Sequence, residues 1–412
     1  MKIPGFSGSI QGFDRRVWIL FYGRIVTATG FSMVWPFLSL YLHNDQGIQM
    51  SYVGMILLFT SLIGSMGQIV GGEIADRFGR KRIMSFALAW RATAFVCIAL
   101  AIALGAHYLI IAVLITLSSF GGSLFDPASN AMIADVIEPT KRLEAYGFLR
   151  IGQNVGWAAG PLIGGLLSIW FSYSVLFVVG AVATLGISVF LRVYITESLK
   201  RGTTQHRFRV RDIAHVADDR QFVAYCFISI ALFIMFGQMS STYAVYSTDS
   251  IGVTTAEVGY LYALNGVMVV FMQFPIARWI SRYRMSSIIA LGSVFYAIGY
   301  GTVGLAGTLG GLALCMVVVT MGEMVVSPAS MNLVANMSPE NERGRYMGVF
   351  GLVSSMGYAF GPFAGGVLMD GLRPDGVMTW AAIGCFGVIA AVGYVILGAR
   401  LSEEKNTCRA RA

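Results

Sequence analysis

The sequence contains 412 residues, of which 56% are hydrophobic and 12% are charged, and its formal net charge at pH 7 is +8. Because soluble globular domains carry about 25% charged residues, this composition excludes a soluble protein and places the chain in a lipid bilayer. The basic residues follow the orientation of the chain in the membrane, and they leave no patch that indicates binding to nucleic acid.

Twelve apolar stretches are long enough to cross a hydrocarbon core of about 30 Å, which requires about 20 residues of helix. We therefore expect an all-α membrane protein, since the strands of a β-barrel would appear as short alternating segments. The stretches lie at residues 16–42, 50–75, 83–104, 108–137, 142–169, 173–195, 221–248, 255–280, 286–306, 310–336, 343–370 and 377–400.

One block of the sequence occurs twice, at 126–165 and at 327–366, with a shift of 201 residues between the copies. Prolines and small residues keep this register over two helices and their loop, which chance similarity rarely achieves. We expect two pseudo-symmetric six-helix bundles, 1–194 and 221–401, with a cytoplasmic linker, 195–220, and a cytoplasmic tail, 402–412. The matched positions include Pro127 with Pro328, Arg142 with Arg343, Gly160-Pro161 with Gly361-Pro362, and Gly164-Gly165 with Gly365-Gly366.

The basic residues predict the orientation of the chain. Of the 29 Lys and Arg, 25 lie in the lead-in, the inner loops, the linker and the tail, whereas the outer loops contain only Arg373. This asymmetry predicts a multi-pass protein of the plasma (inner) membrane with both termini in the cytoplasm. The first apolar run is too long for a signal-peptide core and is expected to be retained. We expect the linker to act as a tether and the tail to be disordered.

Four ionisable residues share one depth in the first half, namely Arg24, Arg91, Asp126 and Arg150. At about 1.5 Å of rise per residue, they lie roughly 12 to 17 Å from the inner surface. An unpaired arginine at this depth costs about 2.5 to 3.5 kcal/mol on insertion scales, so we expect Arg24 to face the protein interior. The cluster either fixes helix packing through internal ion pairs or marks an ion and substrate path.

The loop between the second and third spans has the pattern G-x-x-x-D-R-x-G-R-[KR]. Glycine suits a tight turn, and basic residues attach an inner loop to an anionic leaflet, so any cytoplasmic loop accounts for these residue types. The acid, Asp76, is not explained in this way. The pattern is formed by Gly72, Asp76, Arg77, Gly79, Arg80 and Lys81.

In this loop of a duplicated chain, the pattern resembles the signature of the major facilitator superfamily. The resemblance implies the major facilitator fold and a cytoplasmic latch between the halves, made here of Asp76, Arg80 and Asp135. The second half lacks all three charges together, which fits an ionic network, because one unpaired member would be destabilising. A shift of 205 residues aligns Ser281 and Met285 with the first two, and the shift of 201 aligns Asn336 with the third.

The fifth span contains the run G-x-x-x-G-P-x-x-G-G, in which small residues allow close helix packing and the proline frees a backbone carbonyl. This run resembles the antiporter motif that the superfamily associates with exporters. Its copy in the eleventh span has a second explanation, which is descent by duplication. The motif residues are Gly156, Gly160, Pro161, Gly164 and Gly165.

Glu323 is the acid deep in the second half. In the 201-residue register it aligns with Gly122, one helical turn from Asp126 on the same face, so symmetry predicts that Asp126 and Glu323 line opposite walls of a central cavity. Glu323 has no basic residue nearby in its own half and is the preferred proton carrier, with Asp126 as the second candidate. The alternative is a hydrogen-bonded glutamate without a coupling role. The expected substrate cavity contains Arg24, Arg91, Arg150, Asp126 and Glu323.

Within the superfamily, the chain most resembles the twelve-span bacterial drug:proton antiporters, through Leu124–Pro127, Arg91-Ala92, Pro275–Trp279 and Tyr346–Gly348. One feature departs from that family. Its span-four arginine, which is tied to proton coupling, is missing, and Ser118 and Gly121-Gly122 stand in this region. Either Arg91, Arg150 or Arg24 takes its place, or the coupling differs.

The resemblance implies a secondary active transporter that exports small amphipathic or drug-like molecules by proton antiport and alternating access. We expect a monomer without a cofactor, driven by the proton gradient, whose partners are a small-molecule substrate, protons and the lipid bilayer. Two alternatives remain, a proton-coupled symporter for a small organic anion and a membrane sensor that does not transport. An enzyme is not expected, because the four histidines and five cysteines form no nucleophile or metal pattern.

Overall fold

The computed structural model describes residues 13–138, 141–199, 216, 218–339, 342–372 and 375–407. Regular structure throughout these residues is helical, apart from one isolated backbone bridge between Arg284 and Thr407. The expectation of an all-α protein is confirmed. The lead-in 1–12, Arg373 and most of the predicted linker lie outside the described residues.

The helices form two compact units, Met1–Trp35 with Thr60–Thr204, and Pro36–Phe59 with Gln205–Ala412. The first unit contains α2 (Arg15–Ser32), most of α4 (Met50–Phe78), α5 (Arg80–Ala103), α6 (Tyr108–Ser123), α7 (Phe125–Val136), α8 (Arg142–Leu167) and α9 (Tyr173–Tyr194). The second contains α3 (Trp35–Leu40) from its second residue on, a π-helix (Tyr41–Asp45), the start of α4, α11 (Arg220–Gln238), α12 (Thr242–Asp249), α13 (Thr255–Ile280), α14 (Met285–Gly301), a 3-10 helix (Val303–Leu305), α15 (Leu309–Met337), α16 (Arg343–Gly371) and α17 (Gly376–Arg400).

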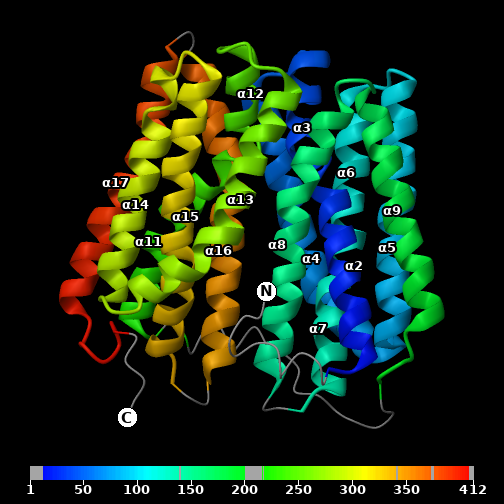
Figure 1. The fold of residues 1–412 in the computed structure, drawn as a ribbon, viewed down its shortest axis with the longest axis horizontal. Helices are drawn as coiled ribbons and strands as arrows, with labels where there is room; N and C mark the ends of the chain where they lie inside the picture. Colours follow the sequence, from blue (N-terminus) through cyan, green and yellow to red (C-terminus); the bar gives the residue numbers. More distant parts are fainter. Residues whose placement is uncertain are drawn as a thin grey trace. The chain divides into compact units, whose positions relative to one another are not determined.

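Both units repeat the same helix pairings, as expected for a duplicated chain. In the first unit α5 packs on α9 and α6, and α2 packs on α8; in the second, α14 packs on α17 and α15, and α11 packs on α16. Figure 1 shows α5 beside α9 and α14 beside α17. Glycines permit the close approach of α8 to α2, because a Cβ at Gly156 would lie 2.6 Å from the carbonyl oxygen of Ile25.

Eleven helical segments of the described residues are long and apolar enough to cross a membrane. They are Arg15–Asp45, Met50–Phe78, Arg80–Ala103, Tyr108–Val136, Tyr173–Tyr194, Arg220–Asp249, Thr255–Ile280, Met285–Leu305, Leu309–Met337, Arg345–Gly371 and Gly376–Arg400. The predicted span 142–169 corresponds to α8, which carries Arg142, Glu144 and Arg150 and is not among the eleven. The chain is therefore a multi-pass membrane protein.

Two predicted spans are interrupted where prolines enter the helix. The first span breaks after Ser32, and α3 begins at Trp35-Pro36. The fourth span breaks at Leu124, three residues before Pro127, into α6 and α7. Proline has no amide hydrogen to donate, and the break leaves Asp126 in the first turn of α7.

Residues Pro36–Phe59 belong to the second unit because specific polar contacts tie them to it. Asp370 of α16 accepts hydrogen bonds from the backbone N–H of Met50 at 3.2 Å and of Ser51 at 2.7 Å, at the start of α4. His43 lies 2.9 Å from Asp249 of α12. The predicted bundle boundaries, 1–194 and 221–401, stay a prediction.

The expectation of a disordered tail is wrong for residues 402–407. The side chain of Asn406 is buried, with 1% exposure. It accepts a hydrogen bond from the backbone N–H of Ser286 at 2.8 Å and donates one to the Ser286 hydroxyl at 2.8 Å. The tail is fixed there because it caps the amino terminus of α14, whose first N–H groups have no partner within the helix.

Candidate functional site

A cavity of about 250 Å³ lies within the first unit, among α2, α4, α5, α6, α7 and α8. Three of the predicted charged residues line it, Arg24, Arg91 and Asp126, together with the aromatic rings of Phe31 and Trp157. Hydroxyl and amide side chains complete the wall. They are Thr27, Ser61, Ser65, Gln68, Ser119, Ser123 and Gln153. A cavity with this lining suits a ligand that has both a charged group and an apolar body.

Arg24 faces the interior, as expected, and is 7% exposed. Its Nη1 lies 2.8 Å from Oδ1 of Asp126. The same guanidinium donates hydrogen bonds to Gln153 at 3.2 Å and to Asn130 at 3.0 Å. Asp126 lines the cavity and keeps 39% of its side chain exposed, whereas Arg24 is held by Asp126, Gln153 and Asn130.

Arg91 lies against α6 at Gly122. A Cβ at Gly122 would overlap the Arg91 guanidinium, so the glycine is required for this approach. The guanidinium carbon lies 5.1 Å from the ring centroid of Phe31, and its buried Nε has no hydrogen-bond partner among the described residues. The cavity therefore contains an arginine without a carboxylate of its own, beside the Arg24–Asp126 pair.

Gly121 fits the same arrangement, because a Cβ there would overlap the ring of Trp90. The Gly121-Gly122 pair lies in the region where the family has its span-four arginine. These two glycines leave space for the side chains of Trp90 and Arg91 of α5. Of the three candidates for that arginine's place, Arg91 is the one whose side chain lies directly on α6.

Arg150 is not brought into this cluster. It is exposed on α8, does not line the cavity, and forms no ion pair with the residues that the structure describes. The predicted layer of four charges is thereby reduced to Arg24, Arg91 and Asp126. The common depth of the four charges stays a prediction, whereas the direction of the Arg150 side chain differs from the expectation.

Glu323 lies on α15 in the second unit and is partly buried. Asn265 of α13 donates hydrogen bonds to Glu323 at 2.9 Å and to Thr320 at 3.0 Å. No basic residue that the structure describes forms an ion pair with Glu323, in agreement with the sequence. Asn265 was missed, because a single amide in an apolar span gives no pattern. The predicted place of Glu323 across a cavity from Asp126 stays a prediction.

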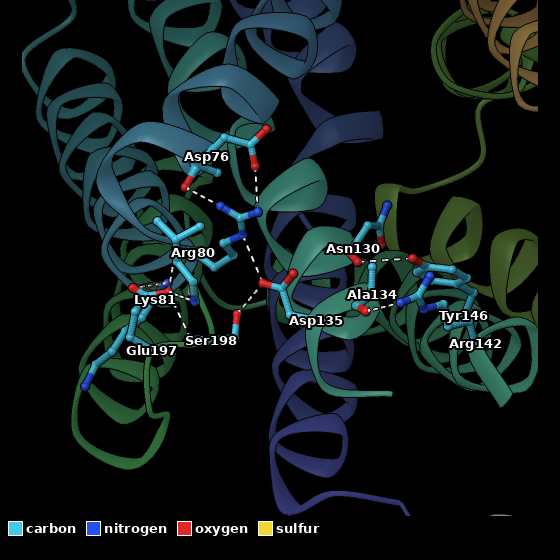
Figure 2. A network of polar contacts seen from close by, with 12 residues as sticks. Asp76, Arg80, Lys81, Asn130, Ala134, Asp135, Arg142, Tyr146, Glu197 and Ser198 are labelled. Carbon is cyan, nitrogen blue, oxygen red and sulfur yellow. Dashed lines mark hydrogen bonds and ion pairs between the residues drawn. The ribbon is translucent and has the colours of Figure 1, made fainter. Parts of the chain in front are cut away.

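The three latch residues meet in the first unit (Figure 2). Arg80 Nη2 lies 2.6 Å from Asp76 Oδ1, and Arg80 Nε lies 3.2 Å from Asp135 Oδ2. Arg80 is 1% exposed, and its Nη1 also donates to the carbonyl oxygen of Ala75 at 3.0 Å. The network joins α4, α5 and α7, while its role as a latch between halves stays a prediction.

Two residues of the predicted linker complete this network, so its start is more than a tether. Glu197 accepts hydrogen bonds from the backbone N–H of Arg80 at 2.9 Å and of Lys81 at 3.2 Å, and Ser198 donates to Asp135 at 2.7 Å (Figure 2). Gly79 has a φ of 103°, as a tight turn requires. The remaining motif residues lie around this turn, with Gly72 against Pro127 and Arg77 over the ring of Phe78.

Two glycines of the antiporter-type motif, Gly156 and Gly160, lie on the α8 surface that faces α2. A Cβ at Gly160 would lie 2.7 Å from the carbonyl oxygen of Thr29. Gly164 and Gly165 are buried, and Pro161 lies inside the continuous helix. In the second unit Gly357 and Gly361 contact α11 in the same way, so the motif has a packing role in both halves.

Comparisons with known proteins agree with this architecture. The sequence profile of the Major Facilitator Superfamily matches residues 20–248 and 226–409. The chain is 26% identical over 394 residues to the multidrug resistance protein MdtH of Salmonella arizonae, covering 94% of each chain. It is 26% identical over 417 residues to a Na(+), Li(+), K(+)/H(+) antiporter of Planococcus maritimus, covering 94% of this chain and 96% of that one.

A solved structure has the same fold, a bacterial homologue of the human lysosomal transporter Spinster in an inward-facing and occupied conformation. It has a TM-score of 0.76 and 15% sequence identity, and the match covers 100% of both chains. Together with the profile match over most of the sequence, these similarities identify the class of protein. The chain belongs to the major facilitator superfamily and is a membrane transporter for small molecules, not an enzyme.

Proposed function

We propose that this transporter exports small amphipathic or drug-like molecules in exchange for protons, by alternating access. The observation that carries the proposal is the cavity of the first unit, where the Arg24–Asp126 ion pair lies beside three aromatic residues and beside Arg91, which forms no ion pair with the described residues. A proton and a charged substrate can compete for such a pair, since each changes the charge that the other meets. Similarity to two relatives, a multidrug resistance protein and a cation/proton antiporter, supports export and exchange.

The proton step is assigned to Asp126 and Glu323. A proton from outside forms an O–H bond on the Asp126 carboxylate and removes its charge, so that the ion pair with Arg24 is lost. Arg24 then keeps only its hydrogen bonds to Asn130 and Gln153 and can accept the charge of a substrate. Glu323, held by Asn265, is the preferred carrier, because no basic residue in the described part of the chain forms an ion pair that would stabilise its ionised form.

The energy source is the proton gradient, without a cofactor. One charge that moves down a potential of 100 mV releases about 2.3 kcal/mol. At about 1.4 kcal/mol per decade, this supports a concentration ratio of roughly fiftyfold for the substrate.

The architecture proposed for this function has α8 as the twelfth span and two six-helix bundles that rock about a central cavity. At about 1.5 Å per residue, the 26 residues of α8 are long enough to cross a bilayer. Basic loops support a cytoplasmic location for both termini. We propose a monomer in the plasma (inner) membrane.

Uptake of a small organic anion together with protons is the second candidate. The unpaired Arg91 guanidinium favours it, because arginine binds carboxylate with two parallel hydrogen bonds. The two functions differ in direction. A symporter accumulates its anion inside when the proton gradient is imposed, whereas an exporter lowers the internal concentration.

The test is transport by everted membrane vesicles that contain the full chain, with cationic, neutral and anionic drug-like compounds and with Na⁺, Li⁺ and K⁺. Asp126→Asn and Glu323→Gln are compared with Glu138→Gln, which changes an exposed acid away from the cavity. We expect gradient-dependent accumulation in the vesicles, abolished by both site variants and kept by the control. Unchanged transport after collapse of the proton gradient would overturn proton coupling, and substrate movement in the opposite direction would favour the symporter.

A further inference from the structure

A second and larger cavity, of about 900 Å³, lies in the first unit where α4 ends, α5 begins and α9 ends. Four basic residues line it, Arg77, Lys81, Arg82 and Arg192, and one acid, Glu197. The cavity is distinct from the charged cavity described above and shares no lining residue with it.

The positive charge of this cavity is compensated only in part by the residues that the structure describes, because Glu197 supplies one negative charge against four positive ones. Lys81, Arg82 and Arg192 form no ion pair with any of them, and Arg77 stacks over the ring of Phe78 at 5.4 Å. The Glu197 carboxylate is engaged by the backbone N–H groups of Arg80 and Lys81. An anion in the cavity would therefore meet several free cations.

The floor of the cavity also offers a hydrogen-bonding group. Ser85 of α5 is 7% exposed and lines the cavity, and its hydroxyl has no hydrogen-bond partner among the described residues. Its carbonyl oxygen accepts a hydrogen bond from Ser188 of α9 at 2.7 Å, which holds the two helices together at this point.

The rest of the wall is apolar and exposed. Phe78 and Phe86 line the cavity with 53% and 51% of their surface exposed. On the neighbouring turn of α9, Val189 and Val193 are 56% and 65% exposed. Exposed side chains of this kind on membrane helices face lipid chains. The cavity thus joins a cationic group of side chains to a lipid-facing surface.

The second half provides an internal comparison. In the 205-residue register, Lys81 and Arg82 align with Ser286 and Ser287. Ser286 is covered by Asn406 of the tail. A non-specific attraction of basic loops to the inner leaflet would act on both halves. The group of four basic residues around one cavity belongs to the first half, which favours a specific site there.

From this arrangement we propose that the cavity binds the phosphate headgroup of an anionic phospholipid, with the acyl chains along Phe86 and α9. Basic pockets between transmembrane helices bind such headgroups in other membrane proteins. The site concerns binding of lipid and does not rest on the transported substrate or on proton coupling.

The experiment is native mass spectrometry of the purified full chain titrated with phosphatidylglycerol, phosphatidylcholine and sn-glycerol 3-phosphate. The double variant Arg82→Gln/Arg192→Gln is compared with Arg278→Gln/Arg282→Gln, a matched pair of exposed basic residues in the second half. We expect the wild type to prefer phosphatidylglycerol over phosphatidylcholine. From about 1 kcal/mol per basic residue at a membrane surface, the first pair should weaken phosphatidylglycerol binding roughly thirtyfold.

The control pair should bind phosphatidylglycerol like the wild type, and Arg82→Lys/Arg192→Lys should retain binding because its charge is unchanged. If the double Gln variant fails to fold, the single variants Arg82→Gln and Arg192→Gln should each show roughly a fivefold loss. Equal phosphatidylglycerol affinity in the Gln variants and the wild type overturns the site. Equal affinity for glycerol 3-phosphate and phosphatidylglycerol would show that the acyl chains add nothing to binding. This result overturns the proposal of a lipid ligand and assigns the site to a soluble phosphate compound.

Discussion

Glu197 in the first unit and Asn406 in the second cap corresponding helix starts, although they are different residue types and lie outside the repeated block. Glu197 accepts hydrogen bonds from the backbone N–H of Arg80 and Lys81 at the start of α5. Asn406 accepts hydrogen bonds from the backbone N–H of Met285 and Ser286 at the start of α14. In each half of the sequence, the segment after the last predicted span thus caps the helix of the third predicted span, α5 or α14.

The residues that follow extend the correspondence to the end of the fourth span. Ser198 donates to Asp135 at 2.7 Å, and the carbonyl oxygen of Thr407 accepts from Asn336 at 2.9 Å. Asp135 and Asn336 are aligned by the 201-residue shift. The duplication therefore preserved a capping device while its chemistry changed from ionic in the first unit to neutral in the second.

Removal of either cap should destabilise the protein. Glu197→Ala leaves the backbone N–H groups of Arg80 and Lys81 without their acceptor, and Asn406→Ala leaves that of Ser286 without its acceptor, a loss of about 1 kcal/mol in each case. Thermal unfolding of the purified chain of 412 residues should show a Tm lower by about 1 °C for each, because the unfolding entropy grows with chain length. Glu138→Gln serves as the control for loss of an exposed acid and should leave Tm unchanged. A Tm equal to that of the wild type in both Ala variants would contradict the capping role.

Gly79 should not tolerate a side chain. Its φ of 103° is a conformation that L side chains rarely adopt, and a Cβ there would overlap the Glu197 carboxylate. Gly79→Ala should therefore cost about 1 to 3 kcal/mol in backbone strain, with a further loss from the displaced cap. Gly147→Ala is the matched control, because no atom lies within 4 Å of its Cβ position. Similar unfolding temperatures for the two variants would rule out this strain.

The ionic network should behave as one coupled unit. Asp76→Asn leaves Arg80 paired with Asp135, and Asp135→Asn leaves it paired with Asp76, so each single variant should have a small effect on stability. The double variant leaves the buried guanidinium of Arg80 without a carboxylate, and its destabilisation should exceed the sum of the singles by about 1 kcal/mol or more. The double-mutant cycle is measured by thermal unfolding, and additive effects would show that the three charges act independently.

Gly122→Ala should displace Arg91 without altering any charge. The new methyl group overlaps the guanidinium, so the arginine must leave its position beside Phe31. We expect Gly122→Ala and Arg91→Gln to weaken binding of an anionic transported compound by about tenfold, the loss expected for one charge-assisted hydrogen bond of about 1.4 kcal/mol. Binding is measured by equilibrium titration, with Gly351→Ala as the control at a glycine without neighbours. Retained anion affinity in both variants would exclude Arg91 from the binding site.

The sequence alone could predict that the three latch residues form one group, because all three charges are absent together from the second half. Asp76, Arg80 and Asp135 align with Ser281, Met285 and Asn336, and a set that is lost as a set indicates direct contact. Their ion pairs in the structure agree with that inference. The capping role of Glu197 and Asn406 was not predicted from the sequence, because both residues lie in polar segments where acids and amides are common.

The charged residues of the first cavity were also predicted from the sequence only in part. All four charges of the first half were assigned to one depth, and the structure brings Arg24, Arg91 and Asp126 to one cavity but leaves Arg150 exposed. Counting residues along a helix gives the height of a side chain. Its direction around the axis depends on how the helix is rotated against its neighbours, here on the glycines that set α8 against α2.

The sequence by itself therefore determined the class of protein, its duplication and the membership of the ionic network, because lipid imposes apolar length and the two halves can be compared with each other. Only the tertiary structure decided which charges meet, which helix ends are capped from distant segments, and which basic residues surround a cavity. These depend on side-chain direction and on contacts between residues far apart in the chain, which no local pattern encodes.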